Sequence, residues 1–191
     1  MVIELAREED REEILELYHM QIGREFCPWD EHYPSNDEIT YDLSRDGLYV
    51  MREADDAVSK SPGAALTGDP RRVNAGTGEE TGSRERGRII AAVSLEEDPQ
   101  VDELPCWTRE LQPGGEIARV AVHPEYQNRG IARQMVQFAL DRLRERGYKS
   151  FHGIVNALNE KALRSYAVFG FRKMGECDMY DQHFICYELK L

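Results

Sequence analysis

The sequence has no hydrophobic run that approaches the roughly 20 apolar residues needed to cross a bilayer. Its N-terminal stretch, MVIELAREEDREE, becomes acidic where a signal peptide would have its apolar core. We therefore expect a soluble, cytoplasmic protein that does not use a membrane as its partner. At 191 residues, the length predicts one domain with a sizeable core.

Cysteine is scarce and scattered along the chain. There is no CxxC pair and no histidine at zinc-finger spacing, and the four cysteines are Cys27, Cys106, Cys177 and Cys186. Spacing of this kind predicts no metal site and no disulfide framework. The simpler interpretation is that the thiols are buried.

Basic residues are also in short supply. The chain has 24 lysines and arginines against 36 aspartates and glutamates, which gives a formal net charge of −12. This balance argues against nucleic acid or an anionic membrane as the main partner. Many soluble proteins use excess acid simply to stay dispersed, so the charge gives only a hint of a cationic substrate.

Hydrophobic periodicity predicts strands and helices in mixed order. The expected strands cover residues 2–6, 48–52, 88–95, 115–123, 150–156, 171–179 and 183–191. The expected helices cover residues 10–23, 36–45, 130–146 and 159–169. Ser35 and Glu38 form an S-x-x-E capping box at the start of the second helix. We expect residues 96–114 to be irregular.

One long segment, residues 54–87, has no apolar period and is rich in glycine, serine, threonine, proline and charge. It separates two expected strands, so we interpret it as a mobile insertion at a hairpin tip. The segment could instead recognise a partner, but composition of this kind more often marks a tolerated loop.

The stretch HPEYQNRGIARQMV joins a strand that ends at Val122 to a long amphipathic helix. Pro124 stops the strand ladder, and Gly130 opens a helix whose first-turn N–H groups have no intrahelical partner. Such a helix end favours phosphate, with Arg129 and Gln127 as additional donors at its rim. Gly130 could also merely end a turn. The loop lacks the GK[ST] of a P-loop and the GxGxxG of a dinucleotide site, which disfavours a nucleotide triphosphatase and a Rossmann enzyme.

Two motifs together resemble the GNAT superfamily of N-acetyltransferases. The first is VAVHPEYQNRGIA, which matches the family's Q/R-x-x-G-x-G/A loop after a V-x-V strand end. The second is NEKALRSYAVFGF, in which Asn159, Tyr166, Gly170 and Phe171 match the family's asparagine, tyrosine and GF pair. The resemblance is specific over residues 116–171. The long insertion departs from the short hairpin usual in the family and puts the acceptor side in doubt.

The resemblance implies an α/β fold with a mixed, mostly antiparallel sheet and helices on both faces. The sheet would be splayed near its fourth and fifth strands, and acetyl-CoA would lie in the gap as cosubstrate, with no metal. The backbone of Val120, Ala121 and Val122 would pair with the pantetheine arm, and Asn159 would fix the coenzyme near its reacting end. The pyrophosphate would be wrapped by Gln127, Asn128, Arg129, Gly130, Ile131 and Ala132.

The reaction that the resemblance implies needs a base and an acid. Glu116 lies where some family members place a glutamate base, whereas the other position used in the family is Ile154 here. A strand-edge carboxylate facing solvent is the alternative interpretation of Glu116. If no bulge intervenes, Glu116 shares a face with Val120 and Val122. Tyr166 would protonate the departing thiolate, although a buried helical tyrosine is often only part of a core.

Trp29 and Tyr33 are the acceptor-side candidates, because the early helices and their connecting loop usually line that side in the family. These aromatic residues could equally pack under the helix pair. The expected activity is acetyl transfer from acetyl-CoA to a primary amine of a small molecule. The alternatives are a non-catalytic acyl-CoA sensor and a protein N-terminal or lysine acetyltransferase. The resemblance leaves a homodimer open.

Overall fold

A computed structural model describes residues 1–25, 27–53 and 86–191, apart from the side chains of Ser165 and Tyr166. The expected insertion at residues 54–87 lies outside the described residues except for Arg86 and Gly87.

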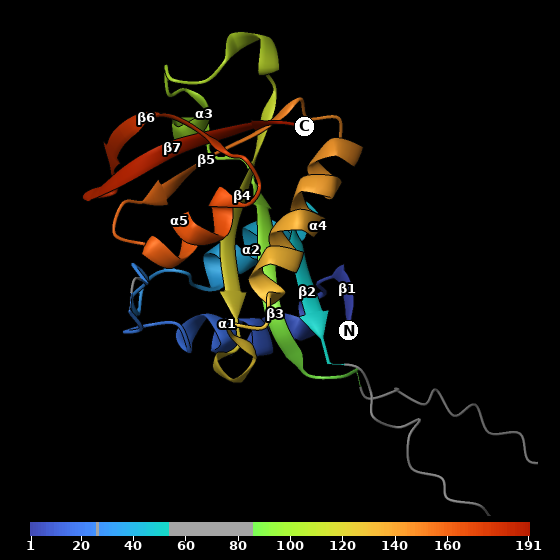
Figure 1. The fold of residues 1–191 in the computed structure, drawn as a ribbon. Helices are drawn as coiled ribbons and strands as arrows, with labels where there is room; N and C mark the ends of the chain where they lie inside the picture. Colours follow the sequence, from blue (N-terminus) through green and yellow to red (C-terminus); the bar gives the residue numbers. More distant parts are fainter. Residues whose placement is uncertain (26, 54–85) are drawn as a thin grey trace, which may run out of the picture.

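A seven-stranded sheet runs through the molecule in the order β1-β2-β3-β4-β5-β7-β6 (Figure 1). All neighbouring strands are antiparallel except β4 and β5, which are parallel, so the sheet is mixed and mostly antiparallel as expected. The strands are β1 (Val2–Leu5), β2 (Leu48–Arg52), β3 (Ile89–Glu96), β4 (Gly114–Val122), β5 (Ser150–Asn156), β6 (Arg172–Met179) and β7 (Gln182–Lys190).

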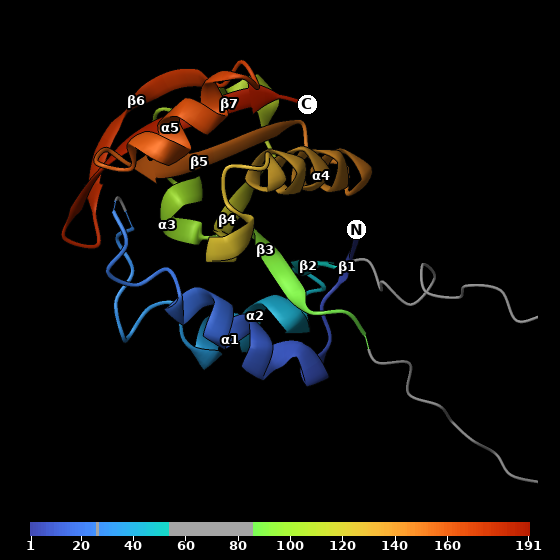
Figure 2. The same cartoon turned by 60° about the horizontal axis from the view of Figure 1, so that its bottom comes forward.

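Helices lie on both faces of this sheet (Figure 2). They are α1 (Arg11–His19), α2 (Asn36–Ser44), α3 (Pro99–Asp102), α4 (Ile131–Glu145) and α5 (Glu160–Ala167). The predicted capping box is confirmed, since Asp37 N–H donates to Ser35 Oγ at 3.1 Å and Ser35 N–H donates to Glu38 Oε2 at 2.7 Å. The first helix is shorter than expected, because the chain leaves it at His19 and continues through turns to Gly23.

The segment 96–114 is less irregular than its sequence indicates. It contains α3, whose N-cap Asp98 accepts from the N–H of Gln100 at 2.8 Å, and a short 3₁₀ turn at Arg109–Leu111. Pro99 occupies the first turn of α3, where its missing N–H costs nothing. A helix of only one turn has too little apolar periodicity to be recognised in a sequence.

Two separate cores hold the sheet between its helices. The buried side of α4 packs on one face of the central strands, against residues such as Ala91, Val93 and Val122. Helices α1 and α2 pack on the other face, against residues such as Ala92 and Ala121. Because successive residues of a strand point to opposite faces, the two cores divide β3 and β4 between them.

A β-bulge at Arg119 changes which residues of β4 share a face. Arg119 has φ 46°, and the register with β3 shifts between Ala118, which pairs with Ser94, and Ala121, which pairs with Ala92. The condition that no bulge intervenes is therefore not met, and Glu116 does not share a face with Val120 and Val122. Glu116 lies on the face of Ala121, which α1 and α2 cover.

Strands β4 and β5 pair only at their beginnings and then diverge (Figure 1). The paired residues are Gly114 with Ser150 and Gly115 with Phe151. A Cβ at Gly114 would lie 2.2 Å from His152 Nδ1, and a Cβ at Gly115 would lie 2.6 Å from Leu143 Cδ2. The two glycines thus let the strands meet there, and the predicted gap opens beyond them.

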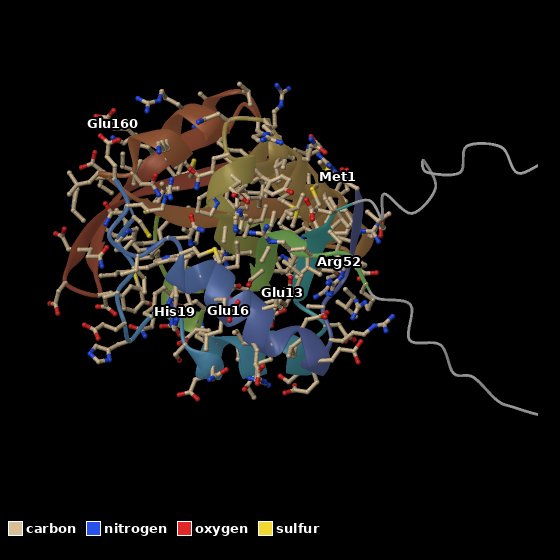
Figure 3. All side chains as sticks on the ribbon, turned by 90° about the horizontal axis from the view of Figure 1, so that it is seen from below. Met1, Glu13, Glu16, His19, Arg52 and Glu160 are labelled. Carbon is tan, nitrogen blue, oxygen red and sulfur yellow. The ribbon has the colours of Figure 1, made fainter. Side chains whose placement is uncertain are left out.

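Ion pairs fasten the two ends of the insertion to the fold. Arg52, which is 7% exposed, donates to Asp10 Oδ1 at 2.5 Å and to the carbonyl oxygen of Gly87 at 2.8 Å. Its guanidinium also lies 3.5 Å from Glu13 Oε2, and Figure 3 shows the two side chains close together beside α1. Arg86 bonds to Asp10 at 3.0 Å. Residues on both sides of the insertion are therefore held by one buried carboxylate.

The cysteines differ from the expectation of buried thiols. Only Cys186 is buried, whereas Cys27, Cys106 and Cys177 are partly exposed. The Sγ atoms of Cys177 and Cys186 lie 3.7 Å apart because β6 and β7 are neighbours in the sheet. Within the described residues, no helix is long and apolar enough to span a membrane.

Candidate active site

A cavity of about 1060 Å³ runs along the gap between β4 and β5. It is lined by residues of both strands, of α4 and α5, of the 21–38 segment and of the turn between β6 and β7. Most of the residues predicted from the sequence meet there: Trp29, Tyr33, Glu116, Val120, Val122, Gln127, Asn128, Gly130, Ile131, Ala132 and Asn159. Ala121 and Arg129 are not among the lining residues.

The start of α4 forms one end of the cavity. Gly130 is its N-cap residue with φ 76°, and Asn128 has φ 60°, so the backbone takes two left-handed steps before the helix begins. Open space surrounds Gly130, since a Cβ there would meet nothing within 4 Å. Glycine is therefore favoured by the backbone angle, and the N–H groups of the first turn remain open to an anion.

Four basic side chains add positive charge to this end of the cavity. They are Arg24, Arg133, Lys161 and Arg164, and none of them was singled out from the sequence. Arg133 lies in the first turn of α4, whereas Lys161 and Arg164 lie on α5. Single exposed basic residues carry no sequence signal, and these four come together only as lining residues of one cavity in the folded protein.

The two rim donors expected at this end have other contacts. Gln127 Nε2 donates to the carbonyl oxygen of Val122 at 3.1 Å, and Gln127 Oε1 accepts from Arg24 at 3.1 Å. The guanidinium of Arg129 lies 5.1 Å from the centre of the Tyr126 ring. Both side chains therefore fix the loop itself.

Asn159 and Tyr166 belong to the second motif. Asn159 Oδ1 accepts from the N–H of Ala162 at 3.0 Å, so Asn159 caps α5 and also lines the cavity. Tyr166 lies in α5, but its side chain is outside the described residues.

Glu116 is buried at the opposite end of the cavity, where β4 and β5 begin to diverge. It is 6% exposed, its Oε1 accepts from the N–H of Asp98 at 2.9 Å, and it lies directly across from Glu96 on β3. Burial raises the pKa of Glu116 to about 9, and the nearby negative charges of Glu96, Asp98 and Asp102 act in the same direction. The alternative of a strand-edge carboxylate facing solvent is excluded by this burial.

Arg119 connects this acidic end of the cavity to helix α2 through Asp42. Its fully buried guanidinium lies 2.9 Å from Asp42 Oδ1 and 3.0 Å from Glu96 Oε1, and it donates to Tyr33 Oη at 3.1 Å. Arg119 was not among the site residues predicted from the sequence. A signal was present, because a charged residue in the middle of the apolar strand GEIARVAV needs a buried partner.

The acceptor-side aromatic residues both pack and line the cavity. Trp29 lies edge-on to the buried Tyr18, with ring centres 5.4 Å apart, and Tyr33 is 41% exposed. Tyr180, on the turn between β6 and β7, donates a hydrogen bond to Asp98 and also faces the cavity. Trp29 therefore packs against the buried Tyr18 and also lines the cavity, and its acceptor-side role stays a prediction.

His152 has a partner that the sequence did not reveal. Its ring is fully buried, stacks on Trp107 at 4.8 Å between ring centres, and bonds through Nε2 to Asp102 Oδ1 at 2.7 Å. Among the described residues, one nitrogen or oxygen atom each of Asp102, Glu116 and His152 lie within 4.8 Å of one another. The short bond between His152 and Asp102 joins these two directly.

The sequence matches the model of the Acetyltransferase (GNAT) family over residues 8–171. No match was found among curated proteins. Similar solved structures include a ribosomal-protein-alanine N-acetyltransferase from Brucella melitensis, with TM-score 0.65, 15% identity and coverage of 100% of both chains. A putative acetyltransferase from Salmonella typhimurium, solved with its cofactor acetyl-CoA, has TM-score 0.65 and 15% identity, with 100% of this chain and 94% of that chain covered.

A third similar structure is the NatC complex bound to Gag peptide and CoA, with TM-score 0.64, 18% identity, and coverage of 100% of this chain and 98% of that chain. At these identities the structures establish the fold. The family match extends over most of the sequence and includes both the loop before α4 and the motif on α5. The chain belongs to the GNAT acetyltransferase family.

Proposed function

We propose that the protein transfers the acetyl group of acetyl-CoA to a primary amine of a small cationic molecule by direct attack. The observation that carries this proposal is the charge of the cavity. Arginine and lysine side chains line it near the starts of α4 and α5, whereas Glu96, Asp98 and Glu116 line its other end. Such a cavity suits an anionic coenzyme at one end and an ammonium at the other.

The coenzyme end would hold acetyl-CoA through backbone groups and basic side chains. The pyrophosphate fits the first turn of α4 after Gly130, with Arg133 beside it. The pantetheine arm fits the edge of β4 from Val120 to Val122, which has no registered partner on β5 among the described residues. Asn159 lines the cavity between the two strands and would lie near the reacting end.

Glu116 would act as the base of the reaction. Removing the proton of an alkyl ammonium with pKa near 10.4 costs about 4 to 5 kcal/mol at neutral pH. An ammonium beside Glu116 favours the ionised carboxylate, because it supplies the positive charge that Glu116 lacks. Glu116 then accepts the ammonium proton, and the neutral amine attacks the thioester carbonyl.

Two further groups would complete the transfer. A backbone N–H of β4 beyond the bulge would stabilise the oxyanion. Tyr166 would give its proton to the departing thiolate, a role that rests on its position in the second motif.

We expect replacement of Tyr166 by phenylalanine to lower kcat by about 10²-fold with little change in coenzyme affinity, because the ring stays and only the proton donor is lost. Steady-state kinetics and a CoA-binding titration measure the two effects. Tyr41→Phe is the matched control, since Tyr41 is exposed on α2 and does not line the cavity. Equal turnover by Tyr166→Phe and wild type would remove Tyr166 from the mechanism.

A protein N-terminus is the second candidate acceptor. It is favoured by the similarity to the ribosomal-protein-alanine N-acetyltransferase and to the NatC complex bound to a peptide. Against it, the turn between β6 and β7 is bonded to the α3 segment through Tyr180 and Asp98, which narrows the acceptor end.

The deciding experiment measures release of the CoA thiol from acetyl-CoA with a panel of amines, together with a coenzyme-binding titration. The panel contains diamines, aminoglycosides, amino acids and peptides with free N-termini. Turnover restricted to small di- or polycationic amines supports the proposal, and turnover restricted to peptides selects the second candidate. Tight coenzyme binding without turnover on any amine shows a sensor.

A further inference from the structure

The proposed reaction leaves a proton on Glu116 that must reach solvent once in every turnover. In the proposed reaction, on which this inference rests, the ammonium nitrogen loses two protons. One ends on the CoA thiol, and the other is accepted by Glu116. Since Glu116 must be free to accept again in the next turnover, one proton per turnover has to leave Glu116 for solvent. Acceptor and coenzyme bound in the cavity would block its side of Glu116, so a second exit would let the proton leave before the products do.

A row of ionisable side chains crosses the sheet at the level of Glu116. Glu96 pairs with Glu116 across β3 and β4, and His152 pairs with Glu188 across β5 and β7. The parallel register of Gly115 with Phe151 places Glu116 and His152 side by side. The row lies on one face of the sheet, and α3 lies beside it near β4 and β5 (Figure 2).

Asp102, at the end of α3, links this buried row to the surface. Its side chain is 45% exposed, whereas the His152 ring to which it bonds is fully buried. Neither Asp102 nor His152 lines the cavity, so both lie behind Glu116 when seen from the acceptor. The three side chains approach within 4.8 Å of one another, a gap that one bridging water spans.

Several features fix His152 in this position. Its ring stacks on Trp107 with an interplanar angle of 9°, and the indole Nε1 of Trp107 donates to the carbonyl oxygen of Val101 at 2.7 Å. Any residue with a Cβ at 114 would collide with His152 Nδ1. Nδ1 has no hydrogen-bond partner among the residues that the structure describes, so the bond from Nε2 to Asp102 is the polar contact that orients the ring there. The ring of His152 is thus fixed in one orientation, and that orientation directs its Nε2–H at Asp102.

We propose that Asp102, oriented by His152, is the exit through which the proton of Glu116 reaches solvent. The O–H bond of the Glu116 carboxyl breaks, its proton passes through a bridging water to the Asp102 carboxylate, and Asp102 releases it at the surface. His152 keeps its own Nε2–H, which it donates to Asp102, and acts as a positioning residue. No oxidant or other reactant is needed.

The charged and ionisable groups around Glu116 are consistent with this direction of transfer. Glu96 on β3 is paired with Arg119, whereas Glu188 on β7 accepts from the N–H of Thr108 at 2.9 Å, so both are engaged. Asp98 is bonded to Tyr180. The groups that face Glu116 from the elements packed around it are Glu96, Asp98, Asp102, His152 and Tyr180, and Arg119 neutralises Glu96 among them.

The test is the Asp102→Asn variant, which keeps an oxygen to accept from His152 but cannot carry the proton. With the amine that wild type acetylates, kcat in dilute buffer should fall about tenfold or more, and imidazole added at increasing concentration should restore it by accepting the proton directly. Glu103→Gln is the matched control, because it removes one exposed negative charge from the next position and should change neither value. An unchanged kcat, or a loss that imidazole does not restore, overturns the proposal.

Variants of His152 separate positioning from proton transfer. His152→Gln keeps an N–H donor for Asp102 and should retain most of the wild-type kcat, whereas His152→Leu should behave like Asp102→Asn, including rescue by imidazole. If His152→Leu does not fold, the Asp102→Asn variant remains the test, because Asp102 is exposed and its replacement should not affect folding. An unaffected His152→Leu enzyme removes the positioning role.

A measurement without turnover distinguishes failure of this inference from failure of the proposed function. In protein labelled with ¹³C at the glutamate side chains, the Glu116 carboxyl signal reports exchange of its proton with solvent during a pH titration. Exchange should be slower in Asp102→Asn than in wild type and in Glu103→Gln. Equal exchange in all three overturns the proton exit, whereas wild type that acetylates no amine refutes only the proposed function.

Discussion

The two ends of the cavity are built in different ways. At the coenzyme end, backbone groups of β4 and α4 face the cavity, and the basic side chains reach it from exposed helix positions. At the acceptor end, Glu116 and Arg119 line the cavity and are each less than a tenth exposed, and Arg119 is paired with the fully buried Asp42. The first end can be altered without disturbing the fold, whereas the second is part of the fold.

The difference teaches where specificity resides in this molecule. A helix start and a strand edge bind any chain with the same phosphates and amides, so they suit a common cosubstrate. Buried carboxylates from distant segments form a site whose charge and shape depend on every neighbour. We therefore expect changes at the coenzyme end to affect affinity and changes at the acceptor end to affect stability and rate.

Replacement of Arg119 by methionine should have the largest effect. It removes the guanidinium that lies 2.9 Å from the buried Asp42 carboxylate and leaves that carboxylate with Arg45 at 3.5 Å and the Ser94 hydroxyl, so the free energy of unfolding should fall by about 3 kcal/mol. Urea unfolding followed by circular dichroism measures this. Arg133→Met is the control at the coenzyme end and should change stability by less than about 0.5 kcal/mol, because Arg133 is exposed. Similar losses in both variants would contradict the comparison.

Replacement of Glu116 by glutamine should lower kcat/KM by about 10²-fold or more, since the amide keeps the shape but cannot accept the ammonium proton. The dissociation constant of acetyl-CoA should stay nearly the same, because the proposed coenzyme residues Val120 to Val122 begin about 13 Å along β4 from Glu116. Kinetics and a binding titration check both values. Weaker acetyl-CoA binding with normal turnover would show that Glu116 contributes to the coenzyme end of the cavity and is not the base.

Stability should depend on pH through the same carboxyl group. The pKa of Glu116 is raised to about 9 in the folded protein from about 4.5, so the folded state holds a proton that the unfolded state has lost between these values. The resulting contribution to stability is complete below about pH 4.5 and disappears as the pH rises through about 9. Between about pH 6 and about pH 8, wild type should lose on the order of 2 kcal/mol relative to Glu116→Gln.

Urea unfolding of both proteins at these two pH values measures that difference. Parallel pH dependence in wild type and Glu116→Gln would mean that Glu116 is ionised in the folded protein, and its assignment as a buried neutral acid would be withdrawn.

Reversal of charge at Arg133 should have the smallest effect. Arg133→Glu should weaken acetyl-CoA binding about tenfold, or about 1.4 kcal/mol, through repulsion of the coenzyme phosphates, with kcat at saturation retained. The loss should diminish at high salt, since the residue is exposed. Arg144→Glu, near the far end of the same helix, serves as the control. Equal affinity of Arg133→Glu and wild type would place the phosphates elsewhere.

The sequence predicted the fold well, and it predicted several residues of β4, α4 and the start of α5 that line the cavity, because both depend on local patterns. Helix and strand periods, the Ser35 capping box and the glycine that starts α4 act within a few residues of each other. The acceptor end was predicted only by Glu116, Trp29 and Tyr33. Arg119, with its partners Asp42 and Glu96, was missed because these residues are far apart in the chain.

The face of Glu116 shows the limit most clearly. Regular alternation along β4 would place Glu116 on the face of Val120 and Val122. The bulge at Arg119 adds one residue, which no local sequence pattern predicts, and so moves Glu116 to the other face. The sequence likewise indicated no hydrogen-bond partner for His152. That partner is Asp102 on α3, a helix too short to be recognised by its hydrophobic period.

The sequence by itself determined the order of the elements, the family and the glycine-led start of α4, since each of these follows from neighbouring residues and their backbone preferences. Only the tertiary structure decided which charges share the cavity, which face Glu116 occupies and that Asp102 and His152 lie behind it. The physical reason is that buried charges select partners through space, and strand pairing joins residues whose separation along the chain carries no signal of their contact.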